Sequence, residues 1–383
     1  MKPIPYGRQS IDAEDIAAVT EVLQDDFLTQ GPRIANFEEK FAEYIGTPHA
    51  VAVSNGTAAL HLAVMALGLQ PGQKVITTPI TFAASANCVR YEGGEVHFAD
   101  IDPETALLDP KAVRKLLEAA PMGTYKGLIP VDFAGYPTDL VAFRELADEF
   151  NLWLLEDACH APGGSFTDAQ GVNHRCGDSS LADAAIFSFH PVKHIACGEG
   201  GMVTMASAEL ADSVSRLRTH GITKDPAQMQ ENHGGWYYEM VDLGYNYRLT
   251  DMQAALGITQ LAKAEAGLAR RREIAQLYDT TFAEVAAVRP LQGHLGHAYH
   301  LYVIRVADRK GLYDHLRSKN IYSQVHYEPV HLQPYYRQFG WKSGDLPLAE
   351  AYYEQCLSLP MYPTLTAEEQ AYVIQSVMEY VGG

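Results

Sequence analysis

No stretch of the 383-residue sequence approaches the roughly 20 consecutive apolar residues that a helix needs to cross a bilayer. Its beginning, MKPIPYGRQSIDAED, soon turns polar and acidic, unlike a secretory signal. We therefore expect a cytoplasmic protein that does not associate with membranes.

Positive charge is also scarce. Lys and Arg total 29 against 47 Asp and Glu, which gives a formal net charge of −18. A protein that binds nucleic acid or an anionic membrane needs a basic face, so this balance argues against both classes. An anionic small substrate remains compatible with it if a few placed groups meet the charge.

Several common motifs are missing. The five cysteines form no C-x-x-C pair, which is typical of reduced thiols rather than of a disulfide framework. No G-x-G-x-x-G follows an apolar run, which argues against a nicotinamide-dependent sugar reductase. We expect no metal site, because the cysteines and histidines between residues 159 and 176 fit no common zinc spacing; these are Cys159, His160, His174 and Cys176.

The sequence does contain short apolar runs that alternate with amphipathic segments. Helical spacing of apolar residues predicts two opening helices at about residues 12–23 and 33–44. Seven runs follow between residues 49 and 205: HAVAV, KVITT, EVHFA, GLIPVDF, LWLLE, AAIFSF and GMVTM. This alternation predicts an α/β fold with a mostly parallel seven-stranded sheet, covered by helices on both faces. Ligands of such sheets bind at the carboxyl ends of the strands.

The rest of the chain predicts a smaller second domain. Residues 220–249 show little periodicity and suggest a long excursion, and a long helix is expected at about 250–285. The strand HAYHLYVIRV, a helix near 310–319 and the run IYSQVHY then indicate a smaller C-terminal α/β domain. We expect residues 1–290 to form the opening helices, the large domain and the linking helix, and residues 291–383 the small domain.

The first strand end with chemical potential is Ser54–Leu60, which follows HAVAV and opens a helix. Its small residues expose backbone N–H groups at the positive end of a helix dipole, which suits a phosphate. A plain turn with a Ser or Asn cap is the alternative interpretation.

The second is Asp157, at the end of LWLLE. An acid there can hold a ring nitrogen protonated, which keeps a pyridine cofactor an effective electron sink. The alternative is a helix cap. His160, three residues on, either bonds a ligand or completes the turn.

The third is Lys193, which follows AAIFSF and precedes the turn Gly198–Gly201. A lysine that is partly removed from water has a lowered pKa and becomes a nucleophilic amine. Phe82, after KVITT, supplies a ring that can stack on a flat cofactor. Phosphate turn, acid, lysine and aromatic ring at the strand ends of one sheet describe a pyridoxal-phosphate site of fold type I.

Over nearly its whole length the sequence resembles the DegT/StrS family of sugar aminotransferases. The motifs that carry the resemblance are LTQGP (28–32), SNGTAAL (54–60), TFAASAN (81–87), EDACHA (156–161), FSFHPVK (187–193), GEGG (198–201) and LGYNYRLTDMQAALG (243–257). Within the family it is most similar to the PseC type, which makes the 4-amino intermediate of pseudaminic acid. The features in common are PIPYGRQ (3–9), His190 in FHPVK, WYYEM (236–240) and HYEPVHLQPYYR (326–337).

The resemblance implies roles for individual residues. Lys193 would form the Schiff base with pyridoxal 5′-phosphate and later shuttle the proton, and Asp157 would pair with the ring nitrogen. His160 would lie near the phenolic oxygen of the cofactor and Phe82 would stack on its ring. The phosphate would be held by Gly56, Thr57, Ala58 and Ser188.

The resemblance also implies partners. Asn246 would reach the phosphate from a neighbouring subunit, so a homodimer with shared active sites is expected. Tyr6, Tyr327 and His331 are candidates for contacts with the sugar or nucleotide, with ordinary packing as an equally good interpretation. Two positions depart from the pattern. His194 stands where the PseC type has proline, and Cys159 where a smaller or hydroxyl residue is usual; neither changes a catalytic role.

The expected reaction moves an amino group from L-glutamate to a nucleotide-linked 4-keto-6-deoxy sugar. The expected product is UDP-4-amino-4,6-dideoxy-N-acetyl-β-L-altrosamine, with a GDP-perosamine or UDP-4-amino-arabinose type of aminotransferase as the alternative. A pyridoxal-phosphate sugar dehydratase is less favoured, because such relatives replace the lysine by histidine and here His194 only follows Lys193. A non-catalytic binding protein would have no use for an intact lysine, acid and phosphate turn.

Overall fold

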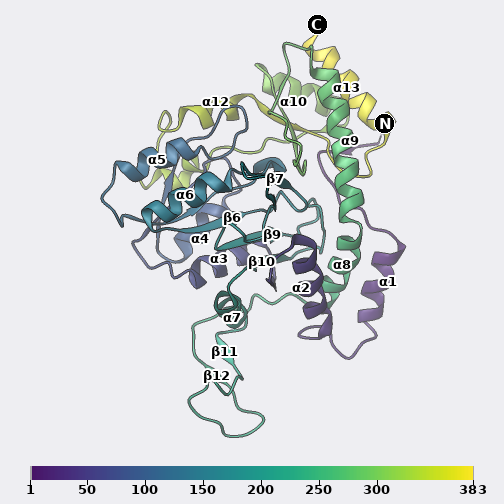
Figure 1. The fold of residues 1–383 in the computed structure, drawn as a ribbon. Coiled ribbons are helices and arrows are strands. Elements are labelled where there is room, and N and C mark those ends of the chain that lie inside the picture. The colour runs from purple at the N-terminus through teal and green to yellow at the C-terminus, as the bar shows by residue number, and fades with distance from the viewer. Residues whose placement is uncertain (1, 383) are drawn as a thin grey trace.

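Two helices open the chain, as expected. The computed structural model describes residues 2–382 (Figure 1). Helix α1 (Ala13–Val22) starts at a capping box in which Asp12 and Asp15 bond each other's backbone N–H groups. Helix α2 (Pro32–Ile45) starts with proline and ends at Gly46, whose φ of 88° is left-handed and favours glycine. Both helices pack against α8 (Asp251–Ala262).

The seven apolar runs each form one strand of a single sheet. In chain order the strands are β2 (His49–Val53), β3 (Lys74–Thr77), β4 (Glu95–Phe98), β5 (Tyr125–Ile129), β6 (Trp153–Asp157), β9 (Ala184–Ser188) and β10 (Gly201–Met205). Their order in space is β2-β10-β9-β6-β5-β3-β4. Strand β10 is antiparallel to both of its neighbours, and the other pairs are parallel. The mostly parallel seven-stranded sheet is therefore confirmed, and six carboxyl ends meet at one edge.

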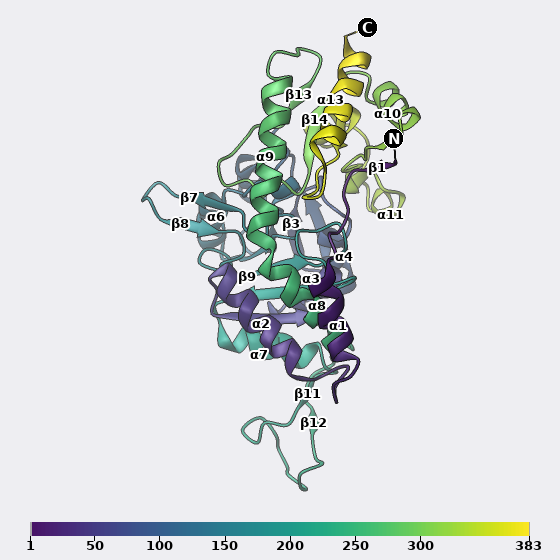
Figure 2. The same cartoon turned by 90° about the vertical axis from the view of Figure 1, so that its right-hand side faces the viewer.

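Helices cover both faces of this sheet (Figures 1 and 2). One face carries α3 (Gly56–Ala66), α4 (Ala84–Tyr91) and α7 (Ala208–Leu217), whose apolar residues share a core with Val53, Val75 and Leu155. On the other face, Phe37 and Phe41 of α2 pack with Phe187 and Met202 of the sheet. Helices α5 (Pro110–Glu118) and α6 (Leu140–Phe150) cover the same side further along. The central strands β6, β9 and β10 are buried along almost their whole length, so both faces of the sheet need a cover of helices.

The long helix expected at 250–285 is in fact two helices, α8 and α9 (Ala264–Phe282). Lys263 between them has φ −100° and ψ −1°, and its N–H donates to the oxygen of Gln260, three residues back. This interrupts the regular ladder of helical hydrogen bonds. Figure 1 shows α8 beside the sheet and α9 running on toward the C-terminal part.

The C-terminal part has its own core around an antiparallel sheet of β13 (Arg289–Pro290), β14 (Tyr302–Arg305) and β16 (Cys356–Leu359). Helices α9, α10 (Arg309–Ser318) and α13 (Ala367–Val381) supply the apolar residues that pack on it. The shorter elements here are β15 (Ile321–Tyr322), η2 (Val330–Leu332), α11 (Pro334–Arg337) and α12 (Pro347–Gln355).

The division at residue 290 stays a prediction, and one pairing crosses it. Strand β1 (Ile4–Pro5) pairs in parallel with β15, so the start of the chain joins the C-terminal core, where Ile4 is fully buried.

Two hairpins project from the large sheet region. Strands β7 (Ser165–Thr167) and β8 (Asn173–Arg175) form one. The other, residues 222–243, contains β11 (Ile222–Thr223) and β12 (Glu239–Met240) and extends away from the rest of the molecule in both views (Figures 1 and 2). We call this segment the arm. The excursion expected at 220–249 is thus a projecting hairpin. No helix among residues 2–382 is long and apolar enough to cross a membrane.

Candidate active site

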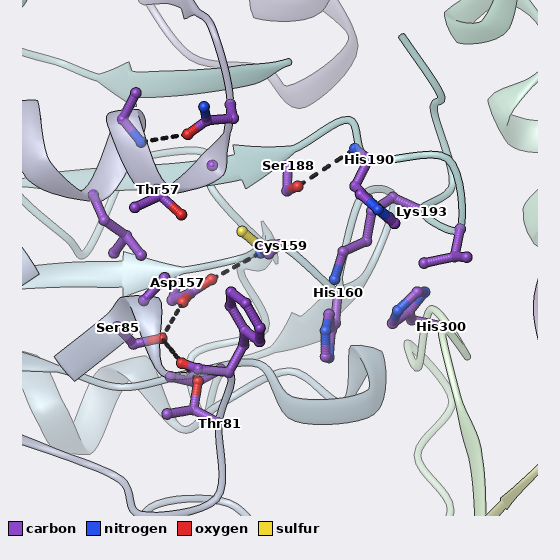
Figure 3. A pocket seen from close by; sticks show the side chains of 18 of the residues that line it. Thr57, Thr81, Ser85, Asp157, Cys159, His160, Ser188, His190, Lys193 and His300 are labelled. Carbon is purple, nitrogen blue, oxygen red and sulfur yellow. Dashed lines mark hydrogen bonds between the residues drawn. The ribbon is translucent and has the colours of Figure 1, made fainter. Parts of the chain in front are cut away.

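A cavity of about 770 Å³ lies where the carboxyl ends of β2, β3, β6 and β9 meet the C-terminal part of the chain. The strand ends contribute Thr57, Thr81, Asp157 and Lys193 with their neighbours, and the C-terminal part contributes His300, His326 and Tyr327. This is the edge of the sheet at which α/β proteins bind ligands. Figure 3 shows how the labelled side chains converge there.

One end of the cavity is built to hold an anion. The side chain of Asn55 caps α3 by accepting a hydrogen bond from the backbone N–H of Ala58, at 2.8 Å. The first N–H groups of the helix and the hydroxyl of Ser188 then border the cavity. Gly56 is required there, because a Cβ at this position would lie 2.9 Å from the Cβ of Ser188. Free N–H groups, hydroxyls and the positive end of the helix dipole suit a phosphate.

The acid Asp157 is held rigidly on the floor of the cavity. Its side chain is almost buried, at 5% exposure. Oδ2 accepts a hydrogen bond from the Ser85 hydroxyl at 2.7 Å, and Oδ1 accepts one from the backbone N–H of Cys159 at 3.2 Å. The hydroxyls of Thr81 and Ser85 are 2.8 Å apart, so a short chain of hydroxyls leads to the carboxylate (Figure 3).

Lys193 extends into the cavity from the turn after β9, where its N–H donates to the oxygen of His190. Burial lowers the pKa of the lysine amine, and the neighbouring Cys159 and Asp157 oppose that effect only in part. Burial, followed by the charge of Asp157, raises the pKa of the Cys159 thiol well above its usual range. A partly desolvated amine beside a neutral thiol is a nucleophile suited to a carbonyl carbon.

The groups in the cavity fit pyridoxal phosphate. The glycine-dependent turn suits an anion, the fixed carboxylate could pair with a ring nitrogen, and the amine could bind an aldehyde carbon. The profile of the DegT/DnrJ/EryC1/StrS aminotransferase family matches residues 9–378. The chain belongs to this family. Its members are pyridoxal-phosphate enzymes, and a putative sugar aminotransferase, Spr1654 from Streptococcus pneumoniae, has been solved in its pyridoxal-phosphate form with a TM-score of 0.88.

Two further relatives cover the chain almost completely. The spore coat polysaccharide biosynthesis protein SpsC of Bacillus subtilis is 40% identical over 390 residues, which span 99% of this chain and 97% of SpsC. Helicobacter pylori PseC, an aminotransferase involved in pseudaminic acid biosynthesis, has a TM-score of 0.89 with 31% identity and covers all of both chains. The Streptococcus pneumoniae structure is 29% identical and covers 99% of each chain. The α/β aminotransferase fold expected from the sequence is therefore confirmed.

Most of the residues that the sequence singled out meet in this one cavity. They are Tyr6, Gly56, Thr57, Ala58, Phe82, Asp157, His160, Ser188, Lys193 and Tyr327. Phe82 is 63% exposed, so its ring borders the open side of the cavity. Their roles toward the cofactor and substrate remain predictions.

Two predicted site residues lie elsewhere. Asn246 is exposed and does not line the cavity of its own chain, whereas its neighbour Tyr247 does. His331 is completely buried, with Nε2 3.1 Å from Glu350 and its ring against Phe98 and Trp341. The structure thus gives His331 a packing environment and does not bring it to the substrate cavity.

The sequence reasoning missed Ser85, His300 and His326. Ser85 is in the TFAASAN motif, but its bond to Asp157 depends on the packing of β3 against the rest of the sheet. His300 is the fourth residue of the predicted strand HAYHLYVIRV, and His326 is the last but one of IYSQVHY. No pattern in the sequence shows that these two segments fold back over a strand edge more than 100 residues earlier.

A second group of ionisable side chains lies behind the strand that carries Asp157. Asp132, Glu156 and Cys176 are buried, and their potential ligand atoms lie within 4.8 Å of one another. Both Glu156 oxygens accept from the N–H of Gly177, at 3.0 and 2.9 Å. Burial, and then the charge of Asp132, raise the pKa of Glu156 well above its usual range, and burial also raises that of Asp132. Two carboxyls so close retain a proton between them, and we interpret the group as a protonated pair.

Proposed function

We propose that this enzyme transfers an amino group from L-glutamate to the keto carbon of a nucleotide-linked 4-keto-6-deoxy sugar. The observation that carries the proposal is the meeting of Lys193, Asp157 and the phosphate turn in one cavity. Pyridoxal phosphate supplies a conjugated ring that withdraws electrons from the carbon being deprotonated. The lysine at position 193 supports amino transfer rather than dehydration, since His194 only follows it.

In this proposal each residue of the chain has a task. Lys193 binds the cofactor covalently and, once released, moves a proton to and from the substrate carbon. Asp157 keeps the ring nitrogen protonated, and its bonds to Ser85 and Cys159 fix its direction. Thr57, Ser188 and the N–H groups around Gly56 hold the phosphate. Phe82 would stack on the ring.

His160 in this scheme has a defined proton position. Its Nδ1 accepts a hydrogen bond from the N–H of Ala134 at 3.2 Å, so the neutral ring carries its proton on Nε2. Burial, and then the charge of Lys193, lower the pKa of His160 well below its usual range, so the ring is neutral. A neutral N–H donor suits the phenolic oxygen of the cofactor.

We further propose a homodimer in which the arm and Asn246 of one subunit complete the site of the other. Among the described residues that line the cavity, Lys193 is the only lysine and there is no arginine, although the substrate carries a diphosphate. A second chain is the simplest source of additional polar contacts. The cytoplasm is the compartment that we propose for this reaction.

For the sugar we propose the 4-keto precursor of UDP-4-amino-4,6-dideoxy-N-acetyl-β-L-altrosamine. The similarity to PseC over the full length of both chains supports this choice, and Tyr6 and Tyr327 line the cavity where a sugar would lie. The GDP-perosamine and UDP-4-amino-arabinose types are the alternatives.

An assay with a panel of UDP-, GDP- and dTDP-linked 4-keto sugars tests the proposal. With glutamate as donor, we expect one UDP-linked N-acetyl sugar to be aminated fastest, with 2-oxoglutarate formed in equal amount. Lys193→Ala is the matched control and should yield no amino sugar. Dehydration of the sugar without 2-oxoglutarate, or turnover by Lys193→Ala at the wild-type rate, contradicts the proposed reaction.

A further inference from the structure

Three imidazole rings stand in a row on the side of the cavity next to Lys193. The ring centroid of His300 is 4.3 Å from that of His160 and 5.9 Å from that of His194. His300 is only 4% exposed and lines the cavity. Figure 3 shows His160 and His300 beside the amine end of Lys193. We call these three residues the histidine row.

Two buried nitrogens in the histidine row lack a hydrogen-bond partner within residues 2–382. They are Nε2 of His194 and Nδ1 of His300. Buried polar atoms are almost always bonded, so an exception needs an explanation. The two rings are neighbours, and one buried water between these nitrogens would satisfy both.

The direction of that water bridge follows from His194. Burial keeps the pKa of both rings well below the usual range, so each ring carries a single proton. A hydrogen bond with the backbone of Pro162 is among the causes that set the pKa of His194, and its Nε2 has no partner among residues 2–382, so we assign its proton to Nδ1. Its Nε2 can only accept. We accordingly assign the proton of His300 to Nδ1, from which it donates to the water, and this leaves a lone pair on Nε2.

His160 and His300 therefore present opposite groups beside Lys193. His160 has its proton on Nε2, because its Nδ1 accepts from Ala134. His300 offers a lone pair. A free lysine amine has two hydrogens and one lone pair, so it can donate to His300 and still direct its lone pair at a carbon atom.

We propose that His300, oriented by His194, is a positioning residue for Lys193. Its Nε2 accepts a hydrogen bond from the free amine and so aims the amine lone pair at the substrate carbon. No bond to carbon forms or breaks at His300. The inference deepens the proposed function and rests on it.

The other groups around Lys193 agree with this assignment. Asp157 and Cys159 raise the pKa of the lysine, and His326 is a fourth neutral ring, whose pKa burial lowers to about 3. Since none of these rings is charged, no cation competes with the lysine for its position. A hydrogen bond to the charged amine favours that form, so losing the acceptor lowers the pKa of Lys193 further.

Two substitutions at His300 distinguish the role of Nε2 from that of Nδ1. In His300→Gln the side-chain amide reaches about as far as Nε2, so a polar atom still faces the cavity. In His300→Asn the amide reaches only as far as Nδ1, so the acceptor is lost. His297→Asn is the matched control, because His297 is equally buried in the same segment but does not line the cavity.

The measurement is the rate at which Lys193 reacts with 1-fluoro-2,4-dinitrobenzene, followed by mass spectrometry across pH in the cofactor-free protein. We expect His300→Asn to shift the midpoint to lower pH and to speed labelling at pH 7 about threefold. His300→Gln and His297→Asn should follow the wild-type curve. In the complete enzyme, His300→Asn should lower kcat about tenfold with little change in KM, and His300→Gln should recover most of it.

Equal curves for wild type and His300→Asn, or equal shifts for Asn and Gln, overturn the proposal. Thermal unfolding of each variant shows whether a change comes from loss of the fold. The labelling uses neither sugar nor glutamate, so its result is independent of the sugar panel. A chain that aminates no sugar contradicts the proposed function and leaves the labelling result to decide on His300.

Discussion

The floor of the cavity and its open side are built in contrasting ways. On the floor, the buried residues Thr81, Ser85 and Asp157 and the backbone N–H of the half-buried Cys159 form a connected hydrogen-bond network. On the open side, Phe82 is 63% exposed, and the arm exposes further apolar side chains. Among these, Trp236 is 78% and Leu243 77% exposed.

The contrast distinguishes the part of the site that one chain forms by itself from the part that needs a second surface. A buried network of this kind fixes the direction of a charged group, and it needs nothing beyond the strands that carry it. Exposed apolar side chains on a projecting hairpin are typical of an interaction site. The acid and amine that we propose as catalytic thus lie on one chain, whereas in the dimer that we propose the second subunit would cover the cofactor.

The strongest test of the floor is Asp157→Asn. The amide keeps the size of the side chain and can still accept from Ser85 or Cys159, but it removes the charge that holds a ring nitrogen protonated. We expect kcat to fall roughly a hundredfold or more, with the thermal midpoint nearly unchanged. A parallel collapse of thermal stability would instead make Asp157 a structural residue.

The strand ends on this floor were predictable because their signal is local. Seven apolar runs alternating with helices predict a mostly parallel sheet, in which Asp157 is the last residue of β6 and Lys193 lies in the turn after β9. The environment of each residue depends on distant segments and was not predictable. Tyr327 and His331 belong to the same motif, yet only Tyr327 reaches the cavity, because the η2 turn directs His331 toward Glu350.

The proton positions in the histidine row could not be predicted from the sequence, for the same reason. They depend on a carbonyl oxygen at Pro162 and an N–H at Ala134, and nothing in the residue types at these positions indicates a bond to a histidine. The break at Lys263 could not be predicted either, since lysine is a good helix former and the pattern on either side is continuous.

The open side is tested by subunit complementation. Lys193→Ala and Asn246→Ala should each be impaired alone, but a mixture that is unfolded and refolded together should regain about a quarter of the wild-type activity. Half of the dimers then contain both variants, and one of their two sites has Lys193 and Asn246 intact. A mixture no more active than the sum of its parts, or a fully active monomer by sedimentation, contradicts shared sites.

A smaller effect on kcat is expected at Ser85, whose hydroxyl donates to Asp157. Ser85→Ala removes a hydrogen bond of 2.7 Å to Asp157 and should lower kcat about tenfold, equivalent to about 1.4 kcal/mol. Thr81→Val removes only the bond between Thr81 and Ser85 and is the matched control, with an effect of about twofold. If both variants lose activity equally, the network acts as a unit rather than through the bond to Asp157.

The smallest effect concerns the protonated pair of Asp132 and Glu156. It should appear in the free energy of unfolding rather than in the reaction rate. The pKa of Glu156 is raised in the folded protein, so the folded state retains a proton that the unfolded state has lost. Stability therefore falls as pH rises from the ordinary glutamate pKa toward the raised one. Glu156→Gln removes this dependence, and its amide can donate to the Asp132 oxygen that has no partner among residues 2–382.

We accordingly expect Glu156→Gln to match the wild type near pH 4.5 and to exceed it by about 1–2 kcal/mol at pH 8, measured by denaturant unfolding. Glu145→Gln, on an exposed position of α6, is the control and should leave the curve unchanged. A wild type that gains stability relative to Glu156→Gln as pH rises would mean that both carboxyls are ionised. Stabilisation of the wild type by added zinc, absent in the variant, would make Asp132, Glu156 and Cys176 a metal site instead.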